Sequence, residues 1–434
     1  MAISSFMGLQ TSLRALLAQQ AALDVTSHNI ANANTVGYTR QEAVLAAATP
    51  LTIDSGAIQT GGGAQLGQGV DVQQYRRLRD QFADLQWRAQ NMTLGDQKTR
   101  SSALDQAQTV LGEPSDTGIN ALFGKFWDAW QDVANHPEST AAKTALVGHA
   151  QNLATSINQL GANLTAIQTL AGQQLTQLTS ASGPVQSAAT QIASLNLAIQ
   201  NAIGAGQQPN DLMDQRDQLL DQLSGYAQVS VTDLGNGSMQ VSLDGQMVVN
   251  DTTFSWPSPY VATGGQLGAL ANLSSASGPI AGYVSDLDAV ANKLATSVNA
   301  IHPGFFSGTN AATLAVAVTP AGVTPGSSGG PGANDIALAV AGLRGGANDA
   351  SRGYADLVAQ IGSDAANAQR SQTSAQALTD AAEQRRQESG GVSLDEEMTN
   401  MVRFQRGYQA ASRAFSTMDE MLDVLINRTG KVGL

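Results

Sequence analysis

The chain has 434 residues, and its 22 basic and 35 acidic side chains give a formal net charge of −13, which disfavours nucleic acid as a partner. It contains no cysteine, which excludes disulfides, thiolate metal sites and thiol catalysis. It also lacks an apolar run of about 18 residues and an apolar signal-peptide core near its start, so we expect neither membrane insertion nor a cleaved signal peptide.

A heptad pattern runs through residues 6–30. Apolar side chains recur there at alternating steps of three and four, with Gln20 and Ser27 as polar interruptions, and this spacing predicts a coiled-coil helix. Burying the large seam side chains would contribute roughly 9 to 18 kcal/mol. Ordering about 27 backbone residues costs on the order of 30 to 50 kcal/mol, so the helix needs a partner, either the other end of the chain or identical neighbours. The seam residues are Leu9, Leu13, Leu16, Leu23 and Ile30.

The segment "IANANTVGYTRQ" (30–41) predicts the end of this helix and a joint to the rest of the chain. Asparagine is a weak helix former that tolerates left-handed dihedral angles, and Gly37 adopts positive φ freely. We expect the helix to unwind here and the chain to resume as an extended segment. The joint motif comprises Asn29, Asn32, Asn34, Gly37, Tyr38 and Arg40.

Helical spacing and composition predict that long antiparallel helices make up most of the body. The predicted spans are 75–92 with a continuation to about 112, 138–179, 185–203, 279–302 and 351–388.

Two further body helices carry side chains that could suggest a site. The stretch "INALFGKFWDAWQDVANH" concentrates aromatic residues, which we interpret as the core anchor of a helical domain rather than a ligand site. The helix that starts at Asp211 carries Asp214, Arg216, Asp217 and Asp221, which we interpret as a solvated face rather than an active site.

From Val229 the hydrophobic period changes to two. Three short segments separated by Gly235-Asn236-Gly237 and by Asp244-Gly245 predict a three-stranded meander, the core of a small outer domain. A linker rich in Gly, Pro and Ser (318–335) is expected on the outside. We interpret "GGGAQLGQG" (61–69) as a flexible hairpin before a strand rather than a phosphate loop.

The C-terminal end repeats the heptad pattern more regularly. Ser393 and Glu396 predict a capping box at the start of this helix, in which each side chain binds the other residue's backbone amide. The seam residues are Met401, Phe404, Tyr408, Phe415, Met418, Leu422 and Leu425.

The sequence gives little sign of catalytic or ligand chemistry. The four histidines (His28, His136, His149 and His302) have no partner at metal-binding spacing. Acidic residues at the start of the last helix are explained by the helix dipole. We therefore predict no catalytic, cofactor-binding or metal-binding residues and no enzymatic activity.

Four segments carry a resemblance to a known family. "ALDVTSHNIANANTVGYTRQ" resembles the N-terminal signature of flagellar rod, hook and hook-associated proteins, and "GVSLDEEMTNMVRFQRGYQAASRAFSTMDEMLDVLI" resembles their C-terminal helix. Residues 67–90 and 209–231 are similar to their body segments. Arg40-Gln41 after Tyr38, and the opening of the last helix at Leu394, favour the FlgK family of the hook-filament junction. Val36 departs from the proline of many relatives, and the family often carries larger outer domains, whose folds are not transferred.

The combined expectation is a mainly α, elongated protein with coiled-coil ends, a long-helix body and a reduced outer β domain. Residues 1–40 with 393–434 would form the terminal domain. Residues 41–227, 264–302 and 349–392 would form the helical body. Residues 228–263 and 303–348 would form the outer domain.

The resemblance implies a structural subunit that joins hook to filament by self-assembly. It implies as partners further copies in a ring or tube, the hook protein, and the next hook-associated protein or filament. It also implies an export chaperone at the C-terminal helix and export by the flagellar type III apparatus to an extracellular site. The alternatives are another rod or hook subunit, or a cell-wall hydrolase with a carboxylate pair such as Asp214 and Asp217.

Overall fold

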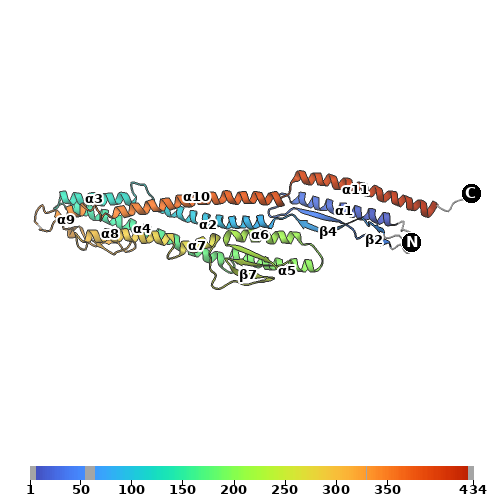
Figure 1. Cartoon of the computed structure of the whole chain (residues 1–434). Helices are drawn as coiled ribbons and strands as arrows, with labels where there is room; N and C mark the ends of the chain where they lie inside the picture. The colour runs from blue at the N-terminus through green and yellow to red at the C-terminus, as the bar shows by residue number, and fades with distance from the viewer. Residues whose placement is uncertain (1–5, 54–63, 329, 429–434) are drawn as a thin grey trace, which may run out of the picture.

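The computed structural model describes residues 6–53, 64–328 and 330–428 and shows an elongated, mainly helical molecule with a small β part (Figure 1). The predicted fold class is confirmed. Both ends of the chain lie at one end of the molecule, as we expected from a chain that runs out along helices and returns. None of the helices in these ranges has the length and apolar character needed to cross a membrane.

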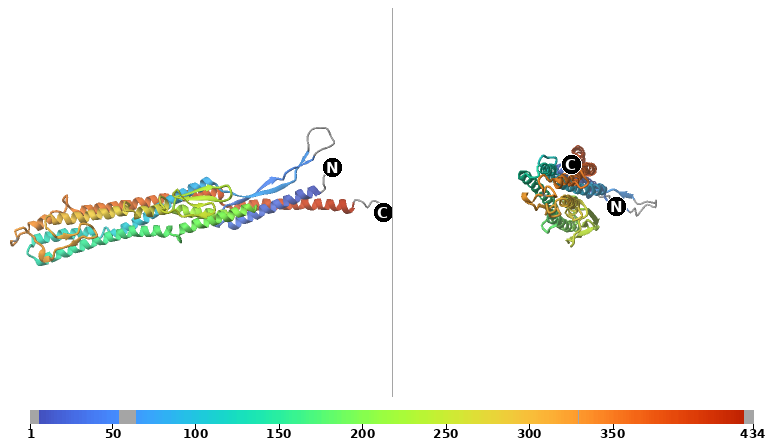
Figure 2. Two further views of the ribbon diagram at one scale, coloured as in Figure 1. Left: turned by 90° about the horizontal axis from the view of Figure 1, so that it is seen from below. Right: turned by 90° about the vertical axis from the view of Figure 1, so that its left-hand side faces the viewer.

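The first and last helices form the end that carries both termini. α1 and α11 lie side by side, and the hairpin that follows α1 packs against it at its base and then leaves the helices (Figure 2). The elements are α1 (Phe6–Asn32), β1 (Gln41–Ala47), β2 (Leu51–Ile53), β3 (Ala64–Leu66), β4 (Val70–Arg77), α11 (Leu394–Asp423) and the π-helical turn η2 (Val424–Arg428). β1 pairs antiparallel with β4, and β2 with β3. The predicted hairpin at 61–69 is thus present in part, since residues 54–63 lie outside the described residues.

Helices along the long axis form the body. They are α2 (Gln81–Leu111), α3 (Ile119–Asn135), α4 (Thr140–Thr179), α5 (Pro184–Gly204), α6 (Asn210–Tyr226), α7 (Gly265–Ser274), α8 (Pro279–Asn299) and α10 (Ala350–Gly390). The main core lies between α2, α3, α4, α8 and α10. The aromatic residues of α3 anchor it: Phe126 and Trp130 are fully buried, and Trp130 packs against Phe305 with ring centroids 5.1 Å apart. The predicted role of this aromatic cluster is confirmed.

A second core lies beside α5 and α6. The sheet there has the strand order β5-β6-β7-β8, with antiparallel neighbours, and Val241 and Val249 pair across its buried face. Its strands are β5 (Val229–Asp233), β6 (Met239–Leu243), β7 (Gln246–Asn250) and β8 (Thr253–Phe254). The three predicted strands are confirmed, and β8 is an additional short strand.

Residues 300–349 form the far end of the molecule, away from the termini (Figure 1). The short elements there are β9 (Phe306–Ser307), β10 (Ala315–Val316), the 3₁₀ turn η1 (Pro320–Gly322) and α9 (Asp335–Ala341). This segment belongs to the main core, whereas 228–263 belongs to the second core, so the two parts that the sequence analysis grouped as one outer domain lie apart. Local patterns mark both as non-helical but do not reveal which helices each packs on.

Two local predictions were wrong. Residues 75–80 are the end of β4 and a loop, not helix, because Tyr75 pairs with Ala43 and Asp80 caps α2 by accepting hydrogen bonds from the Phe82 and Ala83 amides.

The linker 318–335 does not lie wholly outside. Val323 is buried in the main core, and the Thr324 amide donates to Nε2 of buried His302 at 3.1 Å.

Candidate assembly site at the terminal helices

α1 and α11 pack antiparallel in a constant register. Gly8 lies against the Met418 side chain, Gln19 against Gly407, and the Asn29 side chain against Glu397, so equal steps along one helix match equal steps along the other. A Cβ atom at Gly407 would lie 2.6 Å from Gln19 Oε1, which shows how closely the helices approach there. The first and last helices of one chain therefore already serve as partners for each other.

Small and polar side chains line the buried side of α1. The buried residues are Ala18, Ala22, Thr26 and Asn29. Of the predicted seam, Leu422 is buried, while Leu13 is 43% exposed. The remaining seam residues whose side chains are described are half-buried, namely Leu9, Leu16, Leu23, Ile30, Met401, Phe404, Tyr408, Phe415 and Met418. The Leu425 side chain lies outside the described part of the structure.

Large apolar side chains remain on the outside of the pair. Leu17 is 54% exposed, Met398 is 62% exposed, and Leu394, Val402 and Met421 are also exposed. Pairing within one chain thus covers one side of each helix and leaves apolar surface that further helices could bury.

The joint motif is organised around Asn29. Its side-chain amide donates to the Gln41 carbonyl at 2.8 Å and to Glu397 Oε2 at 3.1 Å. Its oxygen accepts hydrogen bonds from the Gln41 amide and from the Tyr38 hydroxyl at 2.7 Å. Burial, with the charges of Asp211 and Asp214 nearby, raises the pKa of Tyr38, so this hydroxyl stays a donor. α1 ends at Asn32, and Gly37 has a φ of +82°, as predicted for a helix stop.

Arg40 joins the start of the hairpin to the start of α11. Its Nε donates to Glu397 at 2.7 Å and its Nη1 to Glu396 at 2.6 Å. Glu397 is buried, so this pair is shielded from water. One of the two hydrogen bonds of the predicted capping box is present, because Ser393 Oγ accepts from the Glu396 amide. The Glu396 carboxylate binds Arg40 instead of the Ser393 amide.

A network of ion pairs lies directly behind the joint, on α6 and the elements around it. Arg77 binds both Asp214 and Asp217 at 2.8 Å. Arg79 lies 3.2 Å from Asp217. These aspartates are buried, so the predicted solvated face of α6 was wrong. The signal that sequence reasoning missed is the run of arginines at 76–79 at the end of the hairpin, because Asp214 and Asp217 lie more than a hundred positions from Arg77 and Arg79.

The same network reaches α2 and α10. Arg88 binds Asp221 at 2.7 Å, and Arg386 binds Asp221 and also lies over the Trp87 ring at 4.3 Å. Arg216 turns the other way, donating to Asn196 at 2.9 Å and so tying α6 to α5. The network joins the hairpin to three body helices at the base of the terminal domain.

Two neighbouring carboxylates of the network have opposite pKa shifts. Burial alone would raise the pKa of Asp217, but the guanidinium groups of Arg79 and Arg77 outweigh it and hold the pKa below its ordinary value. For Asp214 burial dominates and raises the pKa, although Arg77 and the Thr39 amide oppose it. Both carboxylates are occupied by guanidinium groups, which disfavours their use as a hydrolytic pair.

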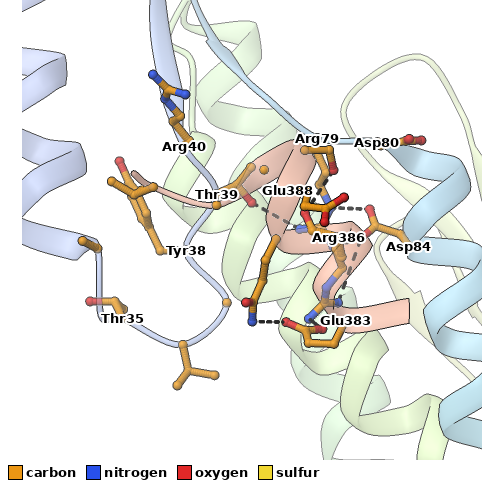
Figure 3. Close-up of a pocket in the computed structure, with 18 of the residues that line it drawn as sticks. Thr35, Tyr38, Thr39, Arg40, Arg79, Asp80, Asp84, Glu383, Arg386 and Glu388 are labelled. Atoms are coloured by element: carbon orange, nitrogen blue, oxygen red, sulfur yellow. Dashed lines mark hydrogen bonds and ion pairs between the residues drawn. The ribbon is translucent and has the colours of Figure 1, made fainter. Parts of the chain in front are cut away.

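A pocket of about 620 Å³ opens at the joint between the loop 33–40 and the adjoining ends of α2 and α10 (Figure 3). Arg79 pairs with Asp84 and Arg386 with Glu383 at its wall, where acidic side chains outnumber basic ones. Within the described ranges no three His, Cys, Asp or Glu side chains gather as a metal site would require.

Comparison with known proteins identifies the family. A family model described as the flagellar hook-associated protein FlgK helical domain matches residues 104–256. Models of the flagella basal body rod protein and of the flagellar basal body rod FlgEFG protein C-terminal match 9–39 and 383–428. Flagellar hook-associated protein 1 of Bacillus subtilis is 31% identical over 99% of this chain and 99% of its own length. The chain belongs to the flagellar hook-associated protein 1 family.

Other relatives match part of the chain. Hook-associated protein 1 of Salmonella typhimurium is 32% identical to this chain, and the match covers 56% of this chain and 42% of that relative. A solved flagellar hook junction protein FlgK from Burkholderia pseudomallei is 26% identical, with a TM-score of 0.45 over 51% of this chain and 44% of that one. The full-length match to the Bacillus subtilis relative confirms the predicted family. As a member of the hook-associated protein 1 family, the chain is a structural protein of the bacterial flagellum.

Proposed function

We propose that the chain is a structural subunit that joins the hook to the filament, and that it assembles by packing α1 and α11 against the same helices of identical neighbours. The observation that carries this proposal is the incomplete cover of the terminal helices. Leu17, Met398 and Val402 stay exposed although α1 and α11 are paired. Burying each such side chain contributes about 1.5 to 3 kcal/mol, so a ring of copies gains from every added contact.

The shape supports a tubular arrangement. Both terminal helices lie at one end of an elongated body (Figure 1), so subunits stacked around an axis can place these helices on the inside and the body outside them. The ion-pair network at the base of the terminal domain would then hold the body at a fixed angle to the tube.

The partners follow from this role. The hook protein would lie on one side of the ring, and the next hook-associated protein or the filament on the other. The exposed apolar positions of α11 suit an export chaperone that covers them before assembly, and export would proceed through the flagellar type III apparatus without a cleaved signal peptide. The subunit would work outside the cell and without enzymatic activity.

The test is to delete residues 394–434. Purified full-length or truncated chain is added to cells whose hooks lack this subunit, and filament-bearing hooks are counted after flagellin is supplied. We expect filaments with the full-length chain and none with the truncated one. Filament growth with the truncated chain would refute assembly through α11.

Localisation separates the junction role from that of a rod or hook subunit. Basal-body, hook and filament fractions are purified and probed with an antibody to the chain. The proposal expects a signal confined to the hook-filament boundary, and a signal spread along the rod or the hook would overturn it.

A further inference from the structure

The side of α1 that points away from α11 is exposed, and we call it the outer face of α1. Its residues recur at alternating steps of three and four, which keeps them on one side of the helix. The part nearer the N-terminus carries leucines, and the part nearer the joint is polar with one acidic group. From residue 13 onward the outer face of α1 comprises Leu13, Leu17, Gln20, Asp24, Ser27 and Ala31.

The side of α11 that points away from α1, the outer face of α11, is exposed as well. It carries apolar side chains near the C-terminus and small and basic ones towards the joint. Glu420 lies about 100° round the helix from Met421 and so borders this face at its edge. The outer face of α11 comprises Arg406, Ala410, Arg413, Thr417, Met421 and Val424.

The charges of the two outer faces are not neutralised within the chain. Among the described residues no ion pair involves Asp24, Arg406 or Arg413. The last turn of α1 also contains no basic residue to balance the negative end of its helix dipole. One face therefore offers negative charge at two places, and the other face offers two arginines.

The geometry of a tube brings these two different faces together. Copies related by rotation about a common axis point the same way and meet head to tail, so that one face of each copy contacts another face of the next. The outer faces of α1 and α11 lie on opposite sides of the helix pair. Because α1 and α11 are antiparallel within the chain, α1 of one copy would also run antiparallel to α11 of the next.

Adjacent copies at the same height would make an unfavourable contact. The register of Gly8 with Met418 within the chain places Leu13 level with Arg413 and Ala31 level with Asp395. If the same register were repeated between copies, Leu13 would remove the Arg413 guanidinium from water without giving it a partner. Asp395 would lie at the negative end of α1, where a carboxylate is destabilising.

A displacement of one copy by about 11 residues, or roughly 16 Å along the helices, removes both conflicts. Leu13 then lies opposite Val424 of the neighbour, and Leu17 lies beside Met421. All four side chains are at least 43% exposed in the single chain, so this contact covers apolar surface on both copies.

The same displacement also satisfies the charges. Asp24 then lies opposite Arg413 of the neighbour. Arg406 lies opposite Ala31, in the last turn of α1, where a cation is favoured by the helix dipole. One displacement thus satisfies the leucines, the acidic group and both arginines.

We propose that the outer face of α1 in one subunit packs antiparallel on the outer face of α11 in the next, displaced by about 11 residues, with Asp24 bound to Arg413 across the contact. The inference rests on the proposed self-assembly and adds the two faces and their register. The occupant is a second copy of the chain, because opposite sides of one helix pair carry the two complementary patterns. A displaced head-to-tail contact builds a helical array rather than a flat ring.

Cysteine cross-linking tests the register directly, because the natural chain contains no cysteine. Ser27 and Ala410 are exposed and would lie opposite each other across the displaced contact. Within one chain they are separated by roughly 16 Å along the helices, whereas a disulfide requires Cα atoms closer than about 7 Å. Thr399 is also exposed and lies level with Ser27, so S27C/T399C reports the undisplaced register as a matched control.

Hook-filament complexes that carry each double variant are oxidised and run on non-reducing gels, where only bonds between chains produce a ladder. We expect a ladder from S27C/A410C and monomers from S27C/T399C and from each single variant. A ladder from S27C/T399C, alone or together with the other pair, would overturn the proposed register. Monomers from both pairs in complexes that still carry filaments would overturn the contact and leave the junction role intact.

Charge exchange supplies the second test. D24K and R413E should each reduce the number of filament-bearing cells, and the double variant D24K/R413E should restore it. The matched controls are D105K and K98E, which change exposed positions of the body helix α2 and should behave as the natural chain.

Failure of the double variant to recover, or equal behaviour of the single variants and their controls, would overturn the pairing of Asp24 with Arg413. The truncation experiment judges assembly through α11 separately.

Discussion

The Asn29 side-chain amide donates to the Glu397 carboxylate at 3.1 Å, so two buried polar groups 368 positions apart join the first helix to the last. Asn29 also binds both backbone groups of Gln41 and the Tyr38 hydroxyl. One side chain thereby fixes where α1 ends, where the hairpin begins and where α11 packs. The joint motif is the structural link between the two ends of the chain.

Replacing Asn29 by alanine should destabilise the terminal domain. The change removes several buried hydrogen bonds and leaves the Gln41 amide and Glu397 without these partners, which costs about 2 to 4 kcal/mol. The midpoint of thermal unfolding, followed by far-UV circular dichroism, should fall. Asn32→Ala is the control, because Asn32 is less buried and its hydrogen bonds are to neighbours within the same turn. Equal shifts for the two variants would contradict the role given to Asn29.

The stability of the joint should depend on the charge of Asp217. Its folded-state pKa lies below the ordinary value of about 4. The stabilisation is therefore fully present above that ordinary pKa and is lost as pH falls through the folded-state pKa. Replacing Asp217 by asparagine leaves Arg77 and Arg79 without this partner, which costs about 3 to 5 kcal/mol. At neutral pH the unfolding midpoint of the variant should be lower than that of the natural chain. As the pH is made acidic, the midpoint of the variant should fall by less.

Asp105→Asn is the control for this experiment, because Asp105 is exposed on α2. It should keep both the midpoint and the acid sensitivity of the natural chain. If Asp217→Asn retained the full acid-induced fall in midpoint, the network would not be the source of that fall.

The α2–α6 crossing should not tolerate a side chain at Gly95. A Cβ atom there would lie 2.1 Å from the Gly225 carbonyl oxygen, which is backbone and cannot rotate away. Glycine to alanine within a helix ordinarily stabilises by about 1 kcal/mol. Here the clash should reverse the sign, so Gly95→Ala is expected to destabilise by about 1 to 3 kcal/mol in denaturant unfolding.

Gly362→Ala provides the comparison on α10, where a Cβ would meet nothing within 4 Å. This variant should be neutral or slightly stabilised. A stabilised Gly95→Ala would mean that the two helices can separate at their crossing without loss.

Features that depend on interactions between residues close together in the sequence could be predicted from the sequence. The two terminal helices, the helix stop at Gly37 and the turns at Gly235 and Asp244 depend on neighbours in the chain and were predicted correctly, whereas the buried side of α1 consists of Ala18, Ala22, Thr26 and Asn29 and not of the predicted seam. The end of β4 was misread because Tyr75 and Leu78 continue the helical spacing of α2, whereas the cap at Asp80 decides the start.

The network behind the joint could not be predicted because its partners are distant in sequence. Arg77 and Asp214 are 137 positions apart, and either residue alone reads as an ordinary surface charge. Likewise Glu396 matches a capping box, and Arg40 outcompetes the Ser393 amide for its carboxylate once the chain has folded. The partners of polar residues at the ends of helices and strands can therefore be assigned only once the three-dimensional structure is known.

The exposed apolar face of α1 should matter for assembly and not for the folding of a single chain. Leu17 is 54% exposed and Leu197, on α5, is 48% exposed, so Leu17→Gln and Leu197→Gln remove similar apolar surface. Neither should change the free energy of unfolding of dilute subunits by more than roughly 0.5 kcal/mol, as is usual for surface substitutions. In the tube, however, each copy of Leu17→Gln would lose about 1.5 to 3 kcal/mol of stabilisation from apolar burial and place a polar amide against apolar neighbours.

We therefore expect swimming halos in soft agar to shrink with Leu17→Gln and to keep their size with Leu197→Gln. Equal halos from two variants secreted in equal amounts would show that the outer face of α1 faces solvent in the assembled flagellum.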